Sequence, residues 1–254
     1  MLDGTKFNMY RIVIIGWRVE KYIERCLSSV ISQDIKDWTA CVVLDPSDDK
    51  TVEIAKNFAE KDSRIKVIAN DTQMFATANI IKSINEQHPE DTDVLITLDA
   101  DDWFAGQDTL SIIDGYYKRN PELLVTHGSW VPYPDPGANT NNAPYSASDW
   151  EKGIRRVDWR ASHLRTFKYK VWKHIKDEDL KGPDGLYARV TWDLAIMFPM
   201  LELSGVSRVQ FVHERIYVYN QESPYNDGKM RLHEQMTFAD YFAAKQPYKY
   251  KEIL

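Results

Sequence analysis

Residues 94–104 have the sequence VLITLDADDWF, an apolar run that ends in three carboxylates. The first five residues, rich in Val, Ile, Leu and Thr, predict a buried β-strand. In open α/β sheets, ligands bind outside the carboxyl ends of the strands, so the acidic residues are expected at a binding edge. Asp99 and Asp101 are two residues apart, and their side chains point the same way if the backbone stays extended.

This acidic pair is suited to a metal-diphosphate site. Two carboxylates held close together repel each other unless a cation lies between them. Hard divalent cations prefer oxygen ligands and often share them with the phosphates of a substrate. Two simpler interpretations stay open: Asp101 or Asp102 caps a helix expected over residues 106–119, or the acidic run is a solvated turn.

Before this stretch, predicted strands alternate with predicted helices. The strands are expected at residues 11–15, 39–44 and 65–68, and the helices at 19–32, 51–61 and 76–86. This alternation is typical of a parallel sheet with crossover helices. Because the carboxyl ends of parallel strands share one edge, Asp45, which follows the second strand, is expected to line the same cleft as Asp99 and Asp101.

After residue 119 the alternation weakens. We expect strands at 123–126, 208–211 and 216–219, helices at 194–204 and 230–245, and a loop rich in Pro, Asn and Gly at 131–144. The loop is either one that closes on substrate or a plain surface loop.

The composition excludes several classes of protein. The net charge of −6 over 254 residues argues against a globally basic nucleic-acid binder. The two cysteines, Cys26 and Cys41, lie in apolar segments and predict a reduced, cytoplasmic protein. The first ten residues lack the apolar region of a signal peptide, and no apolar run approaches the length that spans a membrane.

Three stretches together resemble the family 2 glycosyltransferases, which have the GT-A fold. They are EKYIERCLSSVISQ at 20–33, LDPSDDKT at 44–51 and LDADD at 98–102. The second is similar to the family's D-D-G-S-x-D-G-T turn and the third to its D-x-D motif. The resemblance implies a Rossmann-like α/β domain with a mixed, mainly parallel sheet flanked by helices. It also implies that residues 1–104 bind the nucleotide sugar, while residues 105–254 form a smaller half for the acceptor and the catalytic base.

The resemblance implies a UDP-sugar donor and a divalent metal, Mn²⁺ or Mg²⁺. It places Asp45 at the base of the nucleotide, Asp99 near the ribose and the metal, and Asp101 on the metal. Trp17 stands where the family often has Tyr-Asn and is expected to stack on the base. In two other places the chain departs from the family pattern: Leu44 replaces the first Asp of the second motif, and Ala78 replaces an Arg before the third helix.

Residues 152–176 hold nine Lys or Arg against one Asp, so the segment has a local charge of +8. Positive charge suits a diphosphate leaving group, although a solvated basic face is the simpler interpretation. Residues 163–168, HLRTFK, and residues 220–227, NQESPYND, are similar to a bacterial and viral branch of these transferases. We therefore expect His163 and Arg165 to contact the donor phosphates or the acceptor.

Asp193 begins an apolar helix. The resemblance implies that it is the catalytic base, with Trp192 in place of the Glu that often precedes it; alternatively, Asp193 is only a helix cap. His213 is a candidate for a further metal ligand, since many GT-A enzymes recruit a His from their C-terminal half. A lone His beside a strand also has a structural explanation.

Together these features predict a metal-dependent inverting glycosyltransferase. The acceptor is either a saccharide of a surface polymer or, given the basic segment, a hydroxymethylated base in DNA. The rival hypothesis is a non-catalytic sugar-nucleotide or glycan-binding module with a degenerate site, which the departures at Leu44, Ala78 and Trp192 favour.

Overall fold

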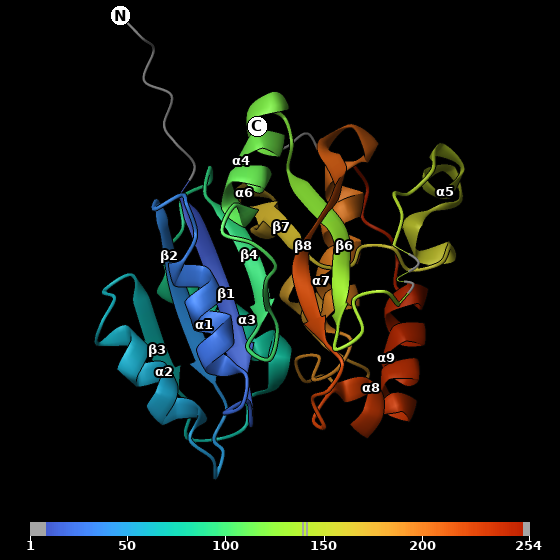
Figure 1. The fold of residues 1–254 in the computed structure, drawn as a ribbon. Helices are drawn as coiled ribbons and strands as arrows, with labels where there is room; N and C mark the ends of the chain where they lie inside the picture. Colours follow the sequence, from blue (N-terminus) through green and yellow to red (C-terminus); the bar gives the residue numbers. More distant parts are fainter. Residues whose placement is uncertain (1–8, 139, 141, 251–254) are drawn as a thin grey trace, which may run out of the picture.

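The computed structural model describes residues 9–138, 140 and 142–250. Within them the strands form one eight-stranded sheet in the order β3-β2-β1-β4-β7-β6-β8-β5 (Figure 1). The strands are β1 Tyr10–Gly16, β2 Trp38–Leu44, β3 Ile65–Ala69, β4 Val94–Asp99, β5 Trp103–Phe104, β6 Val125–Tyr133, β7 Arg165–Lys168 and β8 Val209–Asn220.

The sheet is mixed and mainly parallel, as predicted. Strands β1 to β4 pair in parallel, β7 pairs antiparallel to both β4 and β6, and β8 runs parallel to β6. The short β5, at residues 103–104, pairs antiparallel to β8. The sheet therefore continues across residue 104, and strands from residues 1–104 and from residues 105–254 form one sheet.

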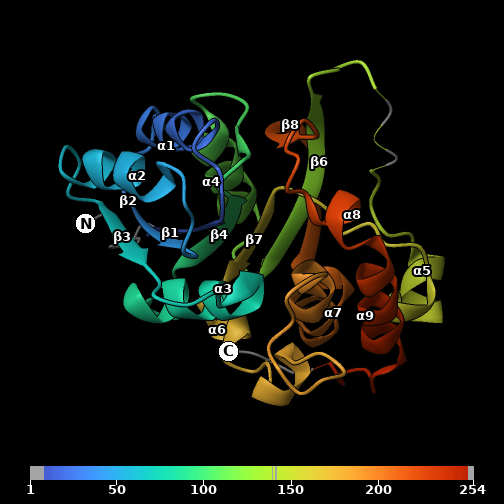
Figure 2. The same ribbon diagram turned by 90° about the horizontal axis from the view of Figure 1, so that it is seen from below.

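Helices cover both faces of the sheet (Figure 2). In this view α1, α2 and α4 lie on one face, and α3, α6, α7 and α9 lie on the other. The helices are α1 Ile23–Ile31, α2 Thr51–Ala59, α3 Phe75–Glu86, α4 Thr109–Arg119, α5 Ala147–Lys152, α6 Tyr169–Trp172, α7 Trp192–Ser204, α8 Asp227–Met230 and α9 Leu232–Ala244, with 3₁₀ turns at Ile154–Arg156, Asp177–Leu180 and Val206–Arg208.

The alternation of side chains along each strand produces two cores. Ile12 and Ile14 of β1 pack beneath α1, whereas Val13 and Ile15 pack on the opposite face with α3 and α7. Both cysteines are buried and form no disulfide. Among the described helices, none has the length and apolar character needed to cross a membrane.

The strand register brings the predicted binding residues to one edge. Ile15 pairs with Asp99 across β1 and β4, and Gly16 pairs with Leu44 across β1 and β2. A side chain at Gly16 would meet the Cβ of Ala100 at 2.6 Å, so only glycine allows the two strand ends to approach this closely. The neighbouring strand ends therefore place three of the predicted residues side by side at this edge: Trp17, Asp45 and Asp99.

Several predicted boundaries differ from the observed ones. The strands expected at 208–211 and 216–219 are one strand, β8, in which exposed polar residues at 213–215 lie at an irregularity in the pairing with β6. Strand β6 runs to Tyr133, so the predicted loop at 131–144 begins within a strand; positions 139 and 141 lie outside the described residues, as do 1–8 at the N-terminus. Strand β7, at Arg165–Lys168, has too few residues to produce a periodic pattern and was missed.

Candidate active site

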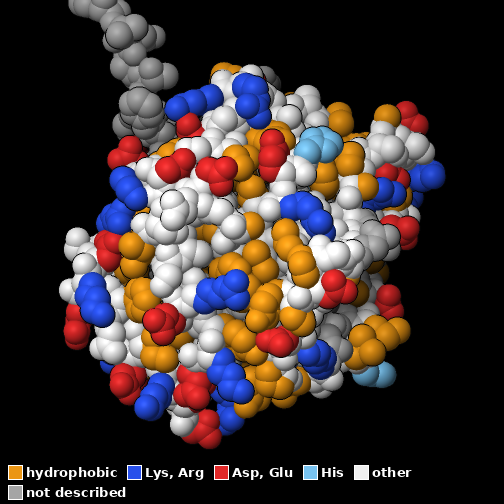
Figure 3. Space-filling model, in the orientation of Figure 1, with side chains coloured by type: hydrophobic (Ala, Val, Ile, Leu, Met, Phe, Trp, Pro, Cys, Tyr) orange, Lys and Arg blue, Asp and Glu red, His pale blue; other side chains and the backbone are white. Residues whose placement is uncertain are grey.

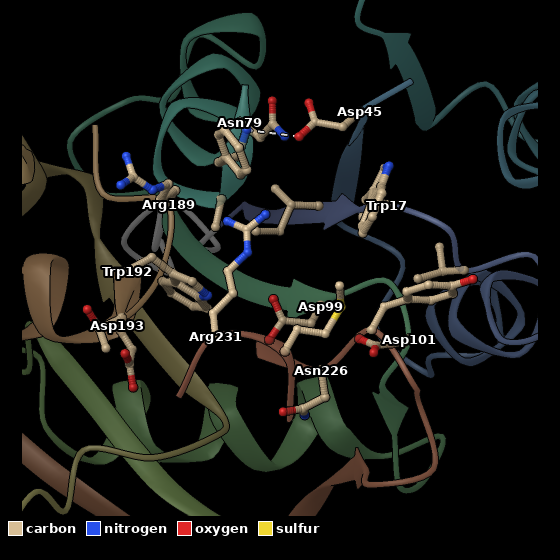
Figure 4. A pocket seen from close by; sticks show the side chains of 18 of the residues that line it. Trp17, Asp45, Asn79, Asp99, Asp101, Arg189, Trp192, Asp193, Asn226 and Arg231 are labelled. Atoms are coloured by element: carbon tan, nitrogen blue, oxygen red, sulfur yellow. Dashed lines mark hydrogen bonds between the residues drawn. The ribbon is translucent and has the colours of Figure 1, made fainter. Parts of the chain in front are cut away.

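A cavity of about 260 Å³ opens at the carboxyl edge of β1, β2 and β4. Residues that precede and begin α7 close it on another side, together with a C-terminal segment between β8 and α9. In Figure 4, Trp17 and Asp101 lie on one side of the cavity, and Trp192 and Asp193 on the other, with Asp99 between them. The cavity thus brings together residues that are more than two hundred positions apart in sequence, from Ile15 to Gln235.

Most of the predicted site residues line this cavity. They are Trp17, Asp45, Asp99, Asp101, His163, Arg165 and Asp193. The exception is His213, whose exposed ring packs edgewise on Phe211 with the centroids 5.1 Å apart. His213 is absent from the cavity wall because it stands at the pairing irregularity of β8. We therefore correct its predicted role: the structure does not bring it to the acidic turn.

Asp45 is buried and builds the wall of the cavity. Its carboxylate accepts hydrogen bonds from the backbone N–H groups of Met74, at 3.0 Å, and Phe75, at 2.9 Å. It also accepts one from the Asn70 amide at 2.9 Å, and this amide donates a second bond to Asn79. Asp45 therefore ties the end of β2 to the start of α3.

Trp17 joins the turn after β1 to the turn after β2. Its indole N–H donates to the carbonyl of Pro46 at 3.0 Å, and its ring meets Tyr225 edge-on with the centroids 5.4 Å apart. These contacts hold an aromatic ring at the mouth of the cavity, beside Asp45.

The acidic stretch does not stay extended beyond Asp99. The N–H of Asp102 donates to the carbonyl of Asp99 at 2.9 Å, which closes a turn. This turn brings Asp102, rather than Asp101, next to Asp99: oxygens of Asp99 and Asp102 and a ring nitrogen of His163 all lie within 4.8 Å of one another. The backbone is therefore not extended from Asp99 to Asp101, and the condition under which their side chains were expected to point the same way is not met, although both line the cavity.

Asp102 is buried and does not cap a helix. Its carboxylate accepts hydrogen bonds from the hydroxyl of Tyr217 and from the N–H of Asn220, the latter at 2.7 Å, both from β8. The N-terminal cap position of α4 belongs instead to Asp108, six residues later. The interpretation of Asp101 or Asp102 as a helix cap is therefore wrong.

Negative charge is concentrated at this turn. Burial, together with the nearby carboxylates of Asp101 and Asp99, raises the pKa of Asp102 well above its usual range, and desolvation also raises the pKa of Asp101. A divalent cation would relieve this repulsion, and carboxylate oxygens are the ligands that Mn²⁺ and Mg²⁺ accept. The donor set of the turn therefore fits such a cation.

His163 lies between the acidic turn and Arg165. Its ring stacks on Tyr217 with the centroids 4.5 Å apart, and its Nδ1 accepts a hydrogen bond from Arg165 Nη1 at 3.1 Å. Burial and the adjacent Arg165 lower the pKa of His163 well below its usual range, so the ring is neutral. With Nδ1 as the acceptor, the proton of the neutral ring is assigned to Nε2, and this nitrogen acts as a donor rather than as a metal ligand.

Arg165 links this histidine to Asp193. Its Nε donates to the carbonyl of Ala161 at 2.8 Å and its Nη2 to Asp193 Oδ2 at 3.1 Å, while its guanidinium stacks on Trp192. The cap position of α7 belongs to Thr191, which has no side-chain cap hydrogen bond, and Asp193 lies inside the helix. The alternative interpretation of Asp193 as a helix cap is therefore wrong.

The rest of the basic segment does not form a single charged face. Arg155 is buried and pairs with Glu202, Lys173 pairs with Asp91, and Arg160 faces Asp149 at 3.8 Å. On the face shown in Figure 3, Lys and Arg side chains alternate with Asp and Glu. Four of the nine cations of this segment, Arg165 included, are thus engaged by carboxylates within the fold.

A family model described as Glycosyl transferase family 2 matches residues 11–179. This chain belongs to glycosyl transferase family 2. It is 24% identical over 230 residues to the uncharacterized glycosyltransferase EpsJ of Bacillus subtilis. The aligned region covers 83% of this chain and 60% of EpsJ.

Solved structures share the GT-A fold of the family. TarS 1–349 of S. aureus has a TM-score of 0.62 at 17% identity, over 83% of this chain and 60% of TarS 1–349. The mannosyltransferase PcManGT of Pyrobaculum calidifontis has a TM-score of 0.61 at 13% identity, over 97% of this chain and 67% of PcManGT. The predicted fold class is therefore confirmed. The chain spans about 60% of the length of EpsJ and of TarS 1–349.

The family 2 match ends before three charged side chains of the cavity wall. Arg189, Asp193 and Arg231 all lie beyond residue 179, and of these only Asp193 was predicted. No motif marks Arg189 or Arg231, because both belong to segments that reach the cavity only through the tertiary fold. Arg231 lies close to the stretch at 220–227, which was the one signal that pointed to this region.

Three non-glycine residues in or directly beside the cavity wall have a left-handed backbone. They are Arg18, Phe75 and Thr191, with φ of 54°, 63° and 50°. Such angles are unfavourable for side chains larger than that of asparagine, and they persist where surrounding contacts hold them. For Phe75 the holding contact is the hydrogen bond from its N–H to Asp45.

Proposed function

We propose that this chain is a metal-dependent inverting glycosyltransferase that moves a sugar from a UDP-sugar onto an acceptor hydroxyl. The observation that carries the proposal is that one cavity joins the acidic turn to Asp193 on its opposite side (Figure 4). Residues 1–104 then supply the donor side, and residues 105–254 supply the catalytic base and the acceptor side. A carboxylate opposite the donor phosphates is the arrangement that direct displacement requires.

The nucleotide would occupy the side of the cavity formed by Trp17 and Asp45. The indole of Trp17 offers a face for stacking on the base. Support for this class of donor comes from TarS, solved with UDP-GlcNAc, and from PcManGT, solved with GDP-Man and Mn²⁺. The choice of UDP and of the sugar is part of the proposal.

Asp99 and Asp101 would hold Mn²⁺ or Mg²⁺, with Asp102 buried beneath them. The ion, when bound, stabilises the negative charge that develops on the leaving diphosphate. Asp102 itself is engaged by Tyr217 and Asn220, which keeps the turn rigid. A rigid turn keeps the two cavity-lining carboxylates in place before substrate arrives.

Asp193 would take the proton from the acceptor hydroxyl as that oxygen attacks the donor sugar. Arg165 engages Oδ2 of Asp193, which leaves Oδ1 as the acceptor of this proton. The Arg165 bond also fixes the orientation of the carboxylate, because the guanidinium is itself anchored to Ala161. Positioning of this kind lowers the entropic part of the barrier.

We propose a saccharide as the acceptor. An acceptor in DNA requires an exposed basic surface for the phosphate backbone, and four of the nine Lys and Arg residues at 152–176 are instead engaged by carboxylates of the protein. A titration of duplex DNA at two salt concentrations tests this choice. Affinity that falls steeply with salt would favour the DNA acceptor over the saccharide.

The first experiment is UDP release from a panel of UDP-sugars with Mn²⁺, with and without chelator. We expect slow hydrolysis that is selective for one sugar and is lost with chelator. Asp37→Asn, which changes an exposed residue at the opposite edge of the sheet, serves as the control and should retain the wild-type rate. Metal-dependent UDP binding without turnover, even with saccharide acceptors added, would favour the non-catalytic module instead.

A further inference from the structure

Two arginines outside the family match reach the cavity, and they differ in how their charge is used. Arg189 forms ion pairs with Asp184 and with Glu234 of α9. Its charge is therefore neutralised within the protein, where it fastens the beginning of α9 to the segment before α7. Arg231 has no carboxylate partner among the described residues.

Arg231 directs its charge into the cavity. In Figure 4 its side chain lies between those of Trp192 and Asp99 and points into the middle of the cavity. Its guanidinium stacks on the ring of Phe75 with 4.9 Å between the guanidinium carbon and the ring centroid. This contact holds the side chain extended while the N–H groups at its edge stay available to a ligand.

The proposed reaction needs a cation at this place. The donor diphosphate, together with Asp99 and Asp101, carries more negative charge than one divalent ion neutralises, and the charge on the leaving group grows in the transition state. Arg165 is already paired with Asp193. Arg189 is already paired with Asp184 and Glu234. Arg231 is thus the cation of the described cavity wall that lies beside Asp99 in Figure 4 and has no carboxylate partner.

We infer that Arg231 binds the diphosphate of the sugar-nucleotide donor and stabilises the nucleoside diphosphate as it leaves. The inference rests on the proposed function and adds a residue from the C-terminal segment to it. A guanidinium can donate two parallel hydrogen bonds to phosphate oxygens, which gives both affinity and orientation. Because Arg231 immediately precedes α9, and Arg189 fixes α9 through Glu234, the position of this cation is set by the contacts between α9 and the segment before α7.

The test compares UDP with uridine as ligands in the presence of Mn²⁺, by calorimetry on the full chain. In Arg231→Gln we expect UDP affinity to fall about 10- to 100-fold and uridine affinity to stay within about twofold. Arg231→Lys should recover part of the UDP affinity, since lysine restores the positive charge but cannot donate two parallel hydrogen bonds as a guanidinium does. Arg119→Gln is the matched control: Arg119 is exposed on α4 and stacks on Tyr116 at 4.7 Å, so the same charge is removed from a similar aromatic contact away from the cavity.

The outcomes separate this inference from the proposed function. Wild-type protein that binds no UDP with Mn²⁺ would overturn both. If the wild type binds UDP and Arg231→Gln binds it equally well, only the role of Arg231 is wrong. Equal losses of UDP and uridine affinity in Arg231→Gln would show that the residue shapes the cavity rather than contacting the diphosphate, and would also overturn the inference.

Discussion

Arg165 Nη2 lies 3.1 Å from Asp193 Oδ2, and the guanidinium is almost wholly buried while the carboxylate is partly open to the cavity. The pair joins β7, in the middle of the sheet, to the first turn of α7. A residue of the predicted basic segment is thus used to orient the proposed catalytic base. This relationship explains why Arg165 is buried although the sequence predicts a contact with the donor phosphates or the acceptor.

Asp193→Asn tests the base. We expect the rate of transfer to an acceptor to fall about 100-fold or more, because an amide cannot accept the proton of the hydroxyl. The side chain keeps its size and one oxygen for Arg165, so UDP affinity should stay within about twofold of wild type. Single-turnover kinetics and UDP titration measure the two quantities. Asp158→Asn, an exposed change, is the control, and a wild-type transfer rate in Asp193→Asn would remove the residue from the mechanism.

Asp101→Asn tests the metal site without any activity assay. In wild-type protein, added Mn²⁺ should raise the melting temperature because the ion binds the folded state and relieves the repulsion among the carboxylates. The variant lacks one proposed ligand and should show little or no increase. Its melting temperature without metal should equal or exceed that of wild type, since a desolvated carboxylate has been replaced by a neutral amide. An undiminished Mn²⁺ shift would contradict the assignment of Asp101.

Glu202→Ala tests whether the ion pair of Arg155, a residue of the basic segment 152–176, stabilises the fold. Arg155 pairs with both carboxylate oxygens of Glu202, at 2.7 and 2.9 Å, and donates to the carbonyl of Phe242. Both side chains are at least nine-tenths buried, so removing Glu202 leaves a buried charge unpaired and should lower the free energy of unfolding by about 3–5 kcal/mol. Urea denaturation measures the loss. Glu86→Ala, which breaks the exposed pair with Lys66, is the comparison and should change the midpoint little.

The lowered pKa of buried His127 predicts that the free energy of unfolding falls in mild acid. Burial lowers the pKa of this histidine from 6.5 to about 4 in the folded protein. The folded state therefore disfavours protonation, so its stability is full above the unfolded pKa and falls as the pH drops from about 6.5 towards 4, by about 3 kcal/mol in total. Urea midpoints at pH 7 and pH 5 measure the effect. His127→Gln removes the titration, and the difference between the two pH values should shrink; an unchanged difference would assign it to other groups.

Much of the donor side could be predicted from sequence because its signals are local. The alternation of strand and helix up to residue 104 can be predicted from the periodicity of apolar side chains. Because the strands are parallel, the sheet order then places Asp45 and Asp99 at one edge. The exception is the geometry of the acidic stretch. A turn at Asp99 replaces the expected extended backbone, and the choice depends on hydrogen bonds to Asp102 from β8, more than a hundred residues away.

The C-terminal half was harder to predict for the same physical reason. Strand β7 is short and lies between β4 and β6, so its place depends on partners rather than on its own pattern. The charges of Arg155 and Arg165 could not be assigned from sequence, because an ion pair and a ligand contact require the same residue type. His213 was placed at the metal by analogy, and the irregularity in β8 puts it on the surface.

The sequence by itself determined the family, the order of the elements in the first half and the acidic residues of the site, since each follows from local pattern and short motifs. Only the tertiary structure decided which carboxylates share a turn, which arginines form ion pairs within the protein and which arginine of the cavity wall has no carboxylate partner. Those outcomes depend on contacts between segments far apart in the chain. The free energy of a buried charge is set by its neighbours in space, whereas a motif records only its neighbours in sequence.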